Sequence, residues 1–207
     1  MSPNTLEAEN LHLWRGERHV LRGVGFCLAA GQCLKLTGAN GAGKTSLLRT
    51  LAGLMYPEEG RVRFRGADVR EDLRAFQGLI AYLGHEPPLK ADLTARENLR
   101  YWIGTRRRVS PALLSASLAR VGAAELSERL VRTLSAGQRR RVALAGLSLC
   151  AVPLWLLDEP ATNLDSEGQA LVGSLIAEQL ARGGLAVAAV HHELPGLGAV
   201  SHLELAA

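Results

Sequence analysis

Gly38-Ala39-Asn40-Gly41-Ala42-Gly43-Lys44-Thr45 is the stretch that decides the fold, because it matches the glycine-rich loop that binds nucleotide phosphates. Its glycines allow positive φ angles, so that backbone N–H groups can curl around the β- and γ-phosphates. Lys44 supplies a positive charge, the Thr45 hydroxyl is a hard oxygen ligand for Mg²⁺, and Ser46 adds a further donor. The alternative is a glycine-rich turn without nucleotide, which this spacing disfavours.

The residues on both sides of the loop support a strand, loop and helix in succession. Residues 32–37 form a short apolar run typical of a buried strand that enters the loop. Residues 46–53 show helical periodicity and close on a glycine, which predicts a helix that leaves it. A helix in this place would also direct the positive end of its dipole at the bound phosphates.

Length and composition indicate one domain with room for a subdomain, since the chain has 207 residues of which 47% are hydrophobic. No basic stretch followed by an apolar run opens the sequence, so we expect no signal peptide. The most apolar segment, 142–157, is shorter than the roughly 20 residues of a membrane span. We therefore expect a cytoplasmic protein. Cys27, Cys33 and Cys150 lie in apolar surroundings without metal-site spacing and are interpreted as core thiols.

A formal net charge of +4 raises nucleic acid or an anionic membrane face as binding partners. The charge is densest in two arginine triplets, at 106–108 and 139–141. Neither triplet has the interleaved aromatic residues of a single-strand binding groove, so no nucleic acid is expected. We interpret both triplets as solvated faces, with a contact of 106–108 to lipid headgroups or membrane subunits as the alternative.

A second phosphate-directed motif is the apolar run 154–157 followed by Asp158 and Glu159. This pattern is typical of a buried parallel strand, and ligands bind at the carboxyl ends of such strands. Asp158 could hold Mg²⁺ opposite Thr45, while Glu159 could deprotonate the water that attacks the γ-phosphate. The alternative is a pair of solvated charges at a strand end.

A third motif, Leu134-Ser135-Ala136-Gly137-Gln138, opens an arginine-rich segment with apolar periodicity. Ser135 and Gln138 have the spacing of a helix capping box. Such a helix start also offers uncovered N–H groups and a hydroxyl, which suit a phosphate. Both interpretations can hold together.

The phosphate loop, the segment LSAGQ at 134–138 and the segment LLDEP at 156–160, in this order, resemble the ATP-binding cassette family. The resemblance spans essentially the whole chain. It implies an α/β fold, with a mainly parallel P-loop core sheet, an antiparallel β-subdomain to which residues 54–85 would contribute strands, and a helical subdomain at about 86–151. The family signature is LSGGQ, and Ala136 replaces one glycine. This departure is tolerable only if residue 136 needs no positive φ.

The resemblance implies roles for further residues. Residues 134–138 would contact ATP bound to a second copy, so that catalysis would need two cassettes. His191 or His192 would contact the γ-phosphate, with the choice left open and His191 favoured. Trp14 would stack on adenine or, equally, pack on the small β-subdomain. The D-loop that crosses to the partner cassette would be Thr162, Asn163, Leu164 and Asp165.

His85 departs from the family, because it occupies the position of a glutamine that approaches Mg²⁺. Mg²⁺ rarely takes a nitrogen ligand, so we expect an indirect contact through bound water. The imidazole could also make nucleotide turnover sensitive to pH between about 5.5 and 7.5.

Further similarities point to one branch of the family, the ATP-binding subunit of the cytochrome c maturation transporter, usually called a haem exporter. They are the segment 84–87, Lys90, the run 134–145 and the compact entry at 17–21. This branch implies an ATPase with ATP and Mg²⁺, docked on integral membrane subunits at the inner face of the plasma membrane and paired with a second cassette. The alternatives are a soluble cassette ATPase acting on a macromolecular complex and a non-hydrolytic regulatory module.

Overall fold

A parallel sheet forms the centre of the computed structural model, which describes residues 4–104, 107–190, 195–198 and 200–206. Within these residues its strands run in the order β6-β7-β8-β3-β9. The strands are β3 (Cys33–Thr37), β6 (Ile80–Leu83), β7 (Leu154–Asp158), β8 (Leu185–Ala189) and β9 (Ser201–Glu204). The strands expected from the apolar runs therefore lie side by side, since β8 pairs with both β3 and β7. All their carboxyl ends meet at one edge.

A second, antiparallel sheet is built mainly from the N-terminal part of the chain, as expected. Its strands are β1 (Thr5–Arg15), β2 (Arg18–Ala29), β4 (Glu59–Phe64) and β5 (Ala67–Asp68), in the order β2-β1-β4-β5. Within the stretch 54–85, β4 and β5 belong to this sheet, as expected, whereas β6 does not. Asp72 caps a short helix, α2 (Leu73–Gly78), by accepting the N–H of Ala75, and the apolar run of β6 then joins the parallel sheet.

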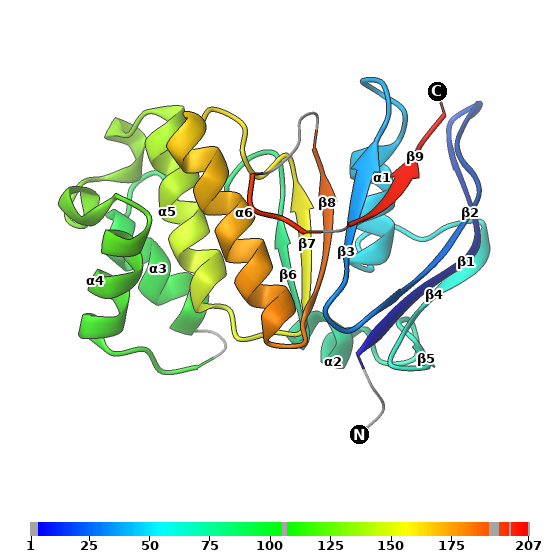
Figure 1. Cartoon of the computed structure of the whole chain (residues 1–207), viewed down its shortest axis with the longest axis horizontal. Coiled ribbons are helices and arrows are strands. Elements are labelled where there is room, and N and C mark those ends of the chain that lie inside the picture. Colours follow the sequence, from blue (N-terminus) through cyan, green and yellow to red (C-terminus); the bar gives the residue numbers. More distant parts are fainter. Residues whose placement is uncertain (1–3, 105–106, 191–194, 199, 207) are drawn as a thin grey trace.

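The helices divide between the two faces of the parallel sheet. Helix α1 (Lys44–Leu51) follows the phosphate loop and lies between the parallel sheet and the antiparallel strands. Helices α3 (Ala95–Gly104), α4 (Pro111–Arg120) and α5 (Ala136–Leu149) lie between β6 and β7 in the chain, with two 3₁₀ turns, η1 (Ala124–Leu126) and η2 (Val131–Thr133). Together with α6 (Ser166–Ala181) they pack at the end of the molecule opposite the antiparallel strands (Figure 1). In the described part of the chain, no helix combines the length and the apolar character that a membrane crossing requires.

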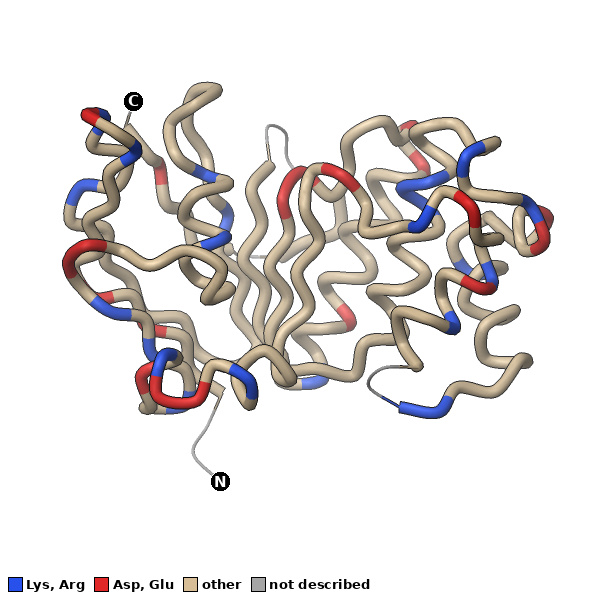
Figure 2. The backbone as a smooth tube through the Cα atoms, turned by 180° about the vertical axis from the view of Figure 1, so that it is seen from behind, with Lys and Arg blue, Asp and Glu red and all other residues tan. Residues whose placement is uncertain are grey.

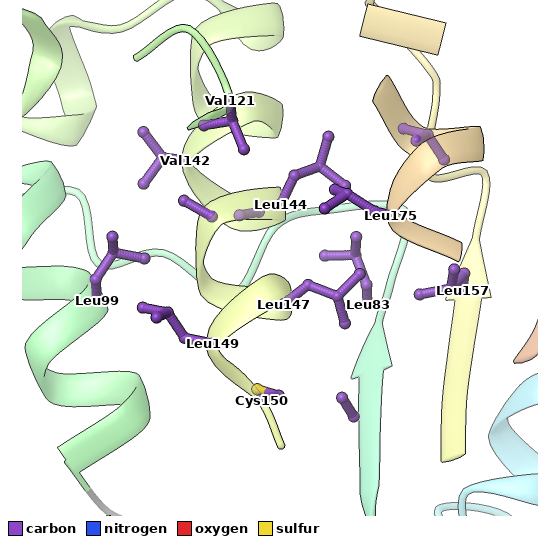
Figure 3. Close-up of a cluster of buried hydrophobic side chains, with 14 of the residues drawn as sticks. Leu83, Leu99, Val121, Val142, Leu144, Leu147, Leu149, Cys150, Leu157 and Leu175 are labelled. Carbon is purple, nitrogen blue, oxygen red and sulfur yellow. The ribbon is translucent and has the colours of Figure 1, made fainter. Parts of the chain in front are cut away.

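The core has two parts, one on each face of the parallel sheet. Successive side chains of a strand point to opposite faces. Trp155 and Leu157 of β7 therefore pack with helices α3 to α6, whereas Leu154 and Leu156 pack with α1 and the antiparallel sheet. Figure 3 shows the first part, where leucines of α5 face those of β6 and β7. The carboxyl edge of the sheet is thus fixed by packed side chains on both faces.

Charged residues of both signs are distributed over the two ends of the molecule (Figure 2). The central strands are tan along most of their length in this view, with acidic residues at one edge of the sheet. The positive residues that make up the net charge of +4 are therefore interspersed with acidic ones over the described part of the chain.

Candidate active site

The phosphate loop joins β3 to α1 and needs its glycines for conformation and for space. Gly38, Gly41 and Gly43 have φ angles of 133°, 80° and 103°, which disfavour any residue with a side chain. A Cβ at Gly43 would lie 2.8 Å from a methyl carbon of Val20, and one at Gly38 would lie 2.5 Å from the carbonyl oxygen of Leu205. The loop therefore curls against β2 and the C-terminal segment, as a cradle of backbone N–H groups requires.

Lys44 begins α1 and is held across the loop. Its Nζ donates to the carbonyl oxygens of Gly38 at 2.7 Å and Ala39 at 3.0 Å. The side chain is buried, as are Ala42 and Ser46 of the same segment. The ammonium group is therefore fixed at the mouth of the cradle, where a nucleotide's terminal phosphates would lie.

Thr45 and Asp158 come from distant parts of the sequence and meet at the carboxyl edge of the sheet. The Thr45 hydroxyl donates to Oδ2 of Asp158 at 2.8 Å, and Asp158 is 2% exposed. A hydroxyl and a carboxylate side by side are the hard oxygen ligands that Mg²⁺ prefers. This pair therefore fits the metal that the sequence predicts at the phosphates.

Glu159 follows Asp158 and is turned toward the loop by an unusual backbone conformation. Its φ is 50°, in the left-handed region, and its N–H donates to the carbonyl of Ala189 in β8 at 3.0 Å. Its Oε2 accepts a hydrogen bond from the Thr162 hydroxyl at 3.1 Å and lies 3.5 Å from Nδ1 of His85. Glu159 and His85, predicted separately, thus form one contact.

A cleft of about 680 Å³ joins these groups. The phosphate loop, His85 and Glu159 line it, together with Arg15, Arg18 and Val20 of the antiparallel sheet. Arg18 donates to the carbonyl of Gly41 at 2.9 Å. The sequence alone does not assign Arg15 or Arg18 to the site. Their proximity to the loop arises from the packing of the β1–β2 turn and has no local signal in the sequence.

Trp14 is absent from the described lining of this cleft. Its ring stacks on His19, with centroids 3.9 Å apart and planes 8° from parallel, and the backbone N–H of Trp14 donates to Oε2 of Glu58 at 3.1 Å. The structure thus places the Trp14 ring against a side chain of the antiparallel sheet, and its contact with adenine stays a prediction.

The segment 134–138 forms the predicted capping box at the start of α5. Ser135 Oγ accepts the N–H of Gln138 at 3.2 Å, and Gln138 Oε1 accepts the N–H of Ser135 at 3.0 Å. Ala136 is the first helical residue and has no positive φ, which explains why alanine is tolerated there. The structure does not bring this segment to the phosphate loop of the same chain, because no described residue of 134–138 lines the cleft.

The segment 162–165 packs directly against the start of α5. A Cβ at Gly137 would lie 2.7 Å from the carbonyl oxygen of Asn163, whose φ is 64°. Asp165 caps α6 by accepting the N–H of Gly168 at 2.9 Å, and its Oδ1 lies 2.9 Å from Nη2 of Arg141. The hydrogen bond from Gly168, followed by the charge of Arg141, lowers the pKa of Asp165 below its ordinary value. Position 137 thus requires glycine because the backbone of Asn163 approaches it too closely for a side chain.

The arginine triplet 139–141 is not a solvated face, which corrects the expectation. Arg140 is 2% exposed and donates to the carbonyls of Gly84 at 3.1 Å and His85 at 2.5 Å. Arg139 donates to the carbonyl of Leu134 at 2.7 Å, and Arg141 bonds to Val121 and Asp165. Each arginine anchors a different segment. In the other triplet, Arg107 donates to the carbonyl of Leu149, and residue 106 lies outside the described residues.

The two candidate histidines at the end of β8, His191 and His192, lie outside the described residues. The strand itself is in place, since β8 pairs with β3 and β7 through Ala189. The assignment of the γ-phosphate contact to either histidine stays a prediction.

Comparisons with known proteins agree with this geometry. The family profile described as "ABC transporter" matches residues 21–162. The chain is 47% identical over 206 residues to the "Cytochrome c biogenesis ATP-binding export protein CcmA" of Methylococcus capsulatus, covering 99% of this chain and 100% of that protein. It is 42% identical over 197 residues to the protein of the same name in Yersinia pestis, covering 95% and 89%.

Solved structures show the same fold. A structure titled "Structure of ATP binding subunit of ABC transporter" superposes with a TM-score of 0.79 at 26% identity, covering 90% of this chain and 79% of that one. A bacterial Atm1-family ABC exporter with ATP bound superposes with a TM-score of 0.82 at 22% identity, covering 92% of this chain and 35% of that one.

Proposed function

The chain belongs to the ABC transporter family, and on this basis we propose that it is the ATP-hydrolysing subunit of a membrane transporter complex that serves cytochrome c biogenesis. The observation that carries the proposal is the meeting of Lys44, Thr45, Asp158 and Glu159 at one edge of the parallel sheet. The relatives named for cytochrome c biogenesis cover nearly the whole chain, which supports the more specific role. Haem handling or export is the activity implied by that branch of the family.

In the proposed reaction, the phosphate loop binds the β- and γ-phosphates of ATP through its backbone N–H groups. Lys44 leaves its loop carbonyls to neutralise charge on the same phosphates. Thr45 and Asp158 would hold Mg²⁺, which supplies further positive charge to the transferring phosphoryl group. Glu159 accepts a proton from the attacking water, whose oxygen bonds to the γ-phosphorus while the bond to ADP breaks.

Glu159 suits this role because its position is determined from several sides. The Ala189 carbonyl fixes its backbone, and the Thr162 hydroxyl and the His85 ring meet its carboxylate at Oε2. A base must be held within hydrogen-bond reach of the water that it activates. The contacts of Glu159 leave its carboxylate on the wall of the cleft.

The proposed active form contains two cassettes. Residues 134–138 contain the capped start of α5, which suits a phosphate. Among the described residues that line the cleft of the same chain, none belongs to this segment. We therefore assign residues 134–138 to ATP bound on a second copy, with residues 162–165 at the same junction. Each chain would form one ATP-binding domain, 1–207, with a helical subdomain at about 86–151.

The membrane subunits of the complex would place the chain at the inner face of the plasma membrane. Opening and closing of the paired cassettes would transmit the free energy of hydrolysis to these subunits. No nucleic acid takes part in this proposal.

The test uses the complex purified with the membrane proteins encoded beside the gene. We expect ATP turnover by the wild-type complex, loss of at least about a hundredfold in Glu159→Gln, and no loss in Glu125→Gln. Glu125 is an exposed residue of η1 and controls for the change of charge. In cells that lack their own copy of the gene, wild type should restore c-type cytochromes and Glu159→Gln should not. Turnover without restored cytochromes would contradict the biogenesis role, and no turnover would contradict the ATPase.

A further inference from the structure

We infer that Arg140 is a positioning residue that holds His85 against Glu159 and ties this contact to the helix that begins at Ser135. The inference rests on the proposed function of the chain as an ATPase. It concerns how hydrolysis in one cassette is linked to the segment that would contact ATP on the other.

The burial of Arg140 needs an explanation, because removing a guanidinium from water costs several kcal/mol unless polar partners replace the water. Arg140 is 2% exposed, and among the described residues no carboxylate lies within ion-pair distance of it. Its resolved partners are the carbonyl oxygens of Gly84 and His85, at 3.1 Å and 2.5 Å. The planar fork of an arginine suits two adjacent carbonyls, and a lysine cannot reproduce it.

The charge of Arg140 is directed toward the acids of the site. Burial lowers the pKa of Arg140, and the negative charges of Asp158 and Glu159 oppose this shift. The guanidinium nevertheless remains a cation at physiological pH. Arg140 therefore adds a fixed positive charge in the neighbourhood of the two acids.

The contact that Arg140 supports is otherwise weakly held. The His85 side chain is 64% exposed, and its Nδ1 lies 3.5 Å from Oε2 of Glu159. Residues 84–90 form no helix or strand, so no ladder of hydrogen bonds fixes the turn. The two bonds from Arg140 hold the peptide groups on both sides of the His85 Cα, from which the side chain extends. The ring's distance to Glu159 consequently depends on Arg140.

Helix α5 connects this anchor to the proposed contact with the second cassette. Arg140 is in the second turn of α5, and Ser135 caps the start of the same helix. Arg139 and Arg141 anchor other segments, at Leu134 and at Val121 and Asp165. A movement of the first turns of α5 toward or away from a second copy would therefore displace the carbonyls of residues 84 and 85, and with them the His85 ring.

A double-mutant cycle on the purified transporter complex tests the inference. Arg140→Met should lower kcat for ATP hydrolysis about tenfold, with KM for ATP changed less than about twofold, because the phosphate loop is untouched. If Arg140 acts through His85, adding Arg140→Met to His85→Gln should lower kcat less than about threefold further. Arg129→Met, on an exposed arginine, is the matched control and should leave kcat unchanged.

The outcomes separate this inference from the proposed function. If the losses of kcat in the two single variants are additive in the double variant, the role of Arg140 is overturned. A rise in KM with kcat unchanged overturns it too. In both cases, ATP turnover by the wild type would still support the proposed ATPase. Absence of wild-type turnover would overturn both. If Arg140→Met does not fold, Arg140→Lys takes its place, because lysine keeps the positive charge but lacks the planar pair of donors of arginine. A reduced kcat that is non-additive with the effect of His85→Gln supports the inference. Additive effects of the two substitutions on kcat refute it.

Discussion

Gly137→Ala is the substitution whose effect follows most directly from the structure, because Gly137 faces backbone and not a flexible side chain. A Cβ at this position would lie 2.7 Å from the carbonyl oxygen of Asn163, about 0.7 Å inside ordinary contact. Asn163 is already in the left-handed region at φ 64°. Its neighbours Thr162 and Asp165 are held by Glu159 and by the start of α6. The oxygen therefore cannot move alone.

The magnitude has two opposing parts. Overpacking against a fixed neighbour costs about 1–3 kcal/mol. Replacing glycine by alanine inside a helix recovers up to about 1 kcal/mol. We therefore expect the free energy of unfolding to fall by about 0–3 kcal/mol. If the clash is relieved by displacing 162–165, Glu159 moves as well, and each 1.4 kcal/mol of lost transition-state stabilisation lowers ATP turnover about tenfold.

Ala136→Gly is the matched control, one residue away on the same helix turn. Residue 136 has a helical conformation, so glycine brings no clash and restores the sequence LSGGQ. Its expected effects are a loss of up to about 1 kcal/mol in unfolding free energy and turnover within about twofold of wild type. Chemical denaturation and steady-state ATPase assays measure both variants. A Gly137→Ala protein that is more stable than wild type and equally active would refute the reasoning.

Three further predictions concern single groups of the site and core. Thr45→Val removes the hydroxyl beside Asp158, so turnover should fall at least tenfold and need more Mg²⁺, as an ATPase titration with Mg²⁺ would measure; an unchanged Mg²⁺ requirement would contradict it. His85→Gln should lower kcat for ATP hydrolysis, because the His85 ring that lies 3.5 Å from Oε2 of Glu159 helps to hold this base, and an unchanged kcat in a steady-state ATPase assay would count against the contact. Burial raises the pKa of the Cys33 thiol to about 12 from 9.0, so the folded state keeps a proton that the unfolded state loses. Unfolding free energy should therefore fall as pH rises above about 9, and Cys33→Ala should weaken this dependence in denaturation at pH 8 and 10; an equal dependence in both proteins would refute the assignment.

The sequence predicted those parts of the site that depend on residue type and on the ends of strands. Thr45 and Asp158 are 113 residues apart, yet Thr45 follows β3 through the phosphate loop and Asp158 ends β7, and parallel strands bring such ends together. The partners of Arg140 could not be predicted, because they are backbone carbonyls and every residue carries one. Trp14 left two interpretations open for a similar reason, since an exposed ring can face a ligand or a neighbouring side chain. Its stacking on His19 follows from the register of β1 and β2.

The left-handed backbone of Glu159 has a consequence for how this sequence can evolve. An L-residue with a side chain pays about 1–2 kcal/mol in that region, which glycine avoids, although glycine's greater freedom in the unfolded chain offsets part of the gain. Glu159→Gly should therefore leave a folded protein of equal or greater stability that hydrolyses no ATP. Random mutation without selection for turnover would favour loss of this carboxylate over its retention. With Glu159 as the proposed base, a glutamate at this position would reflect selection for chemistry against the preference of the fold.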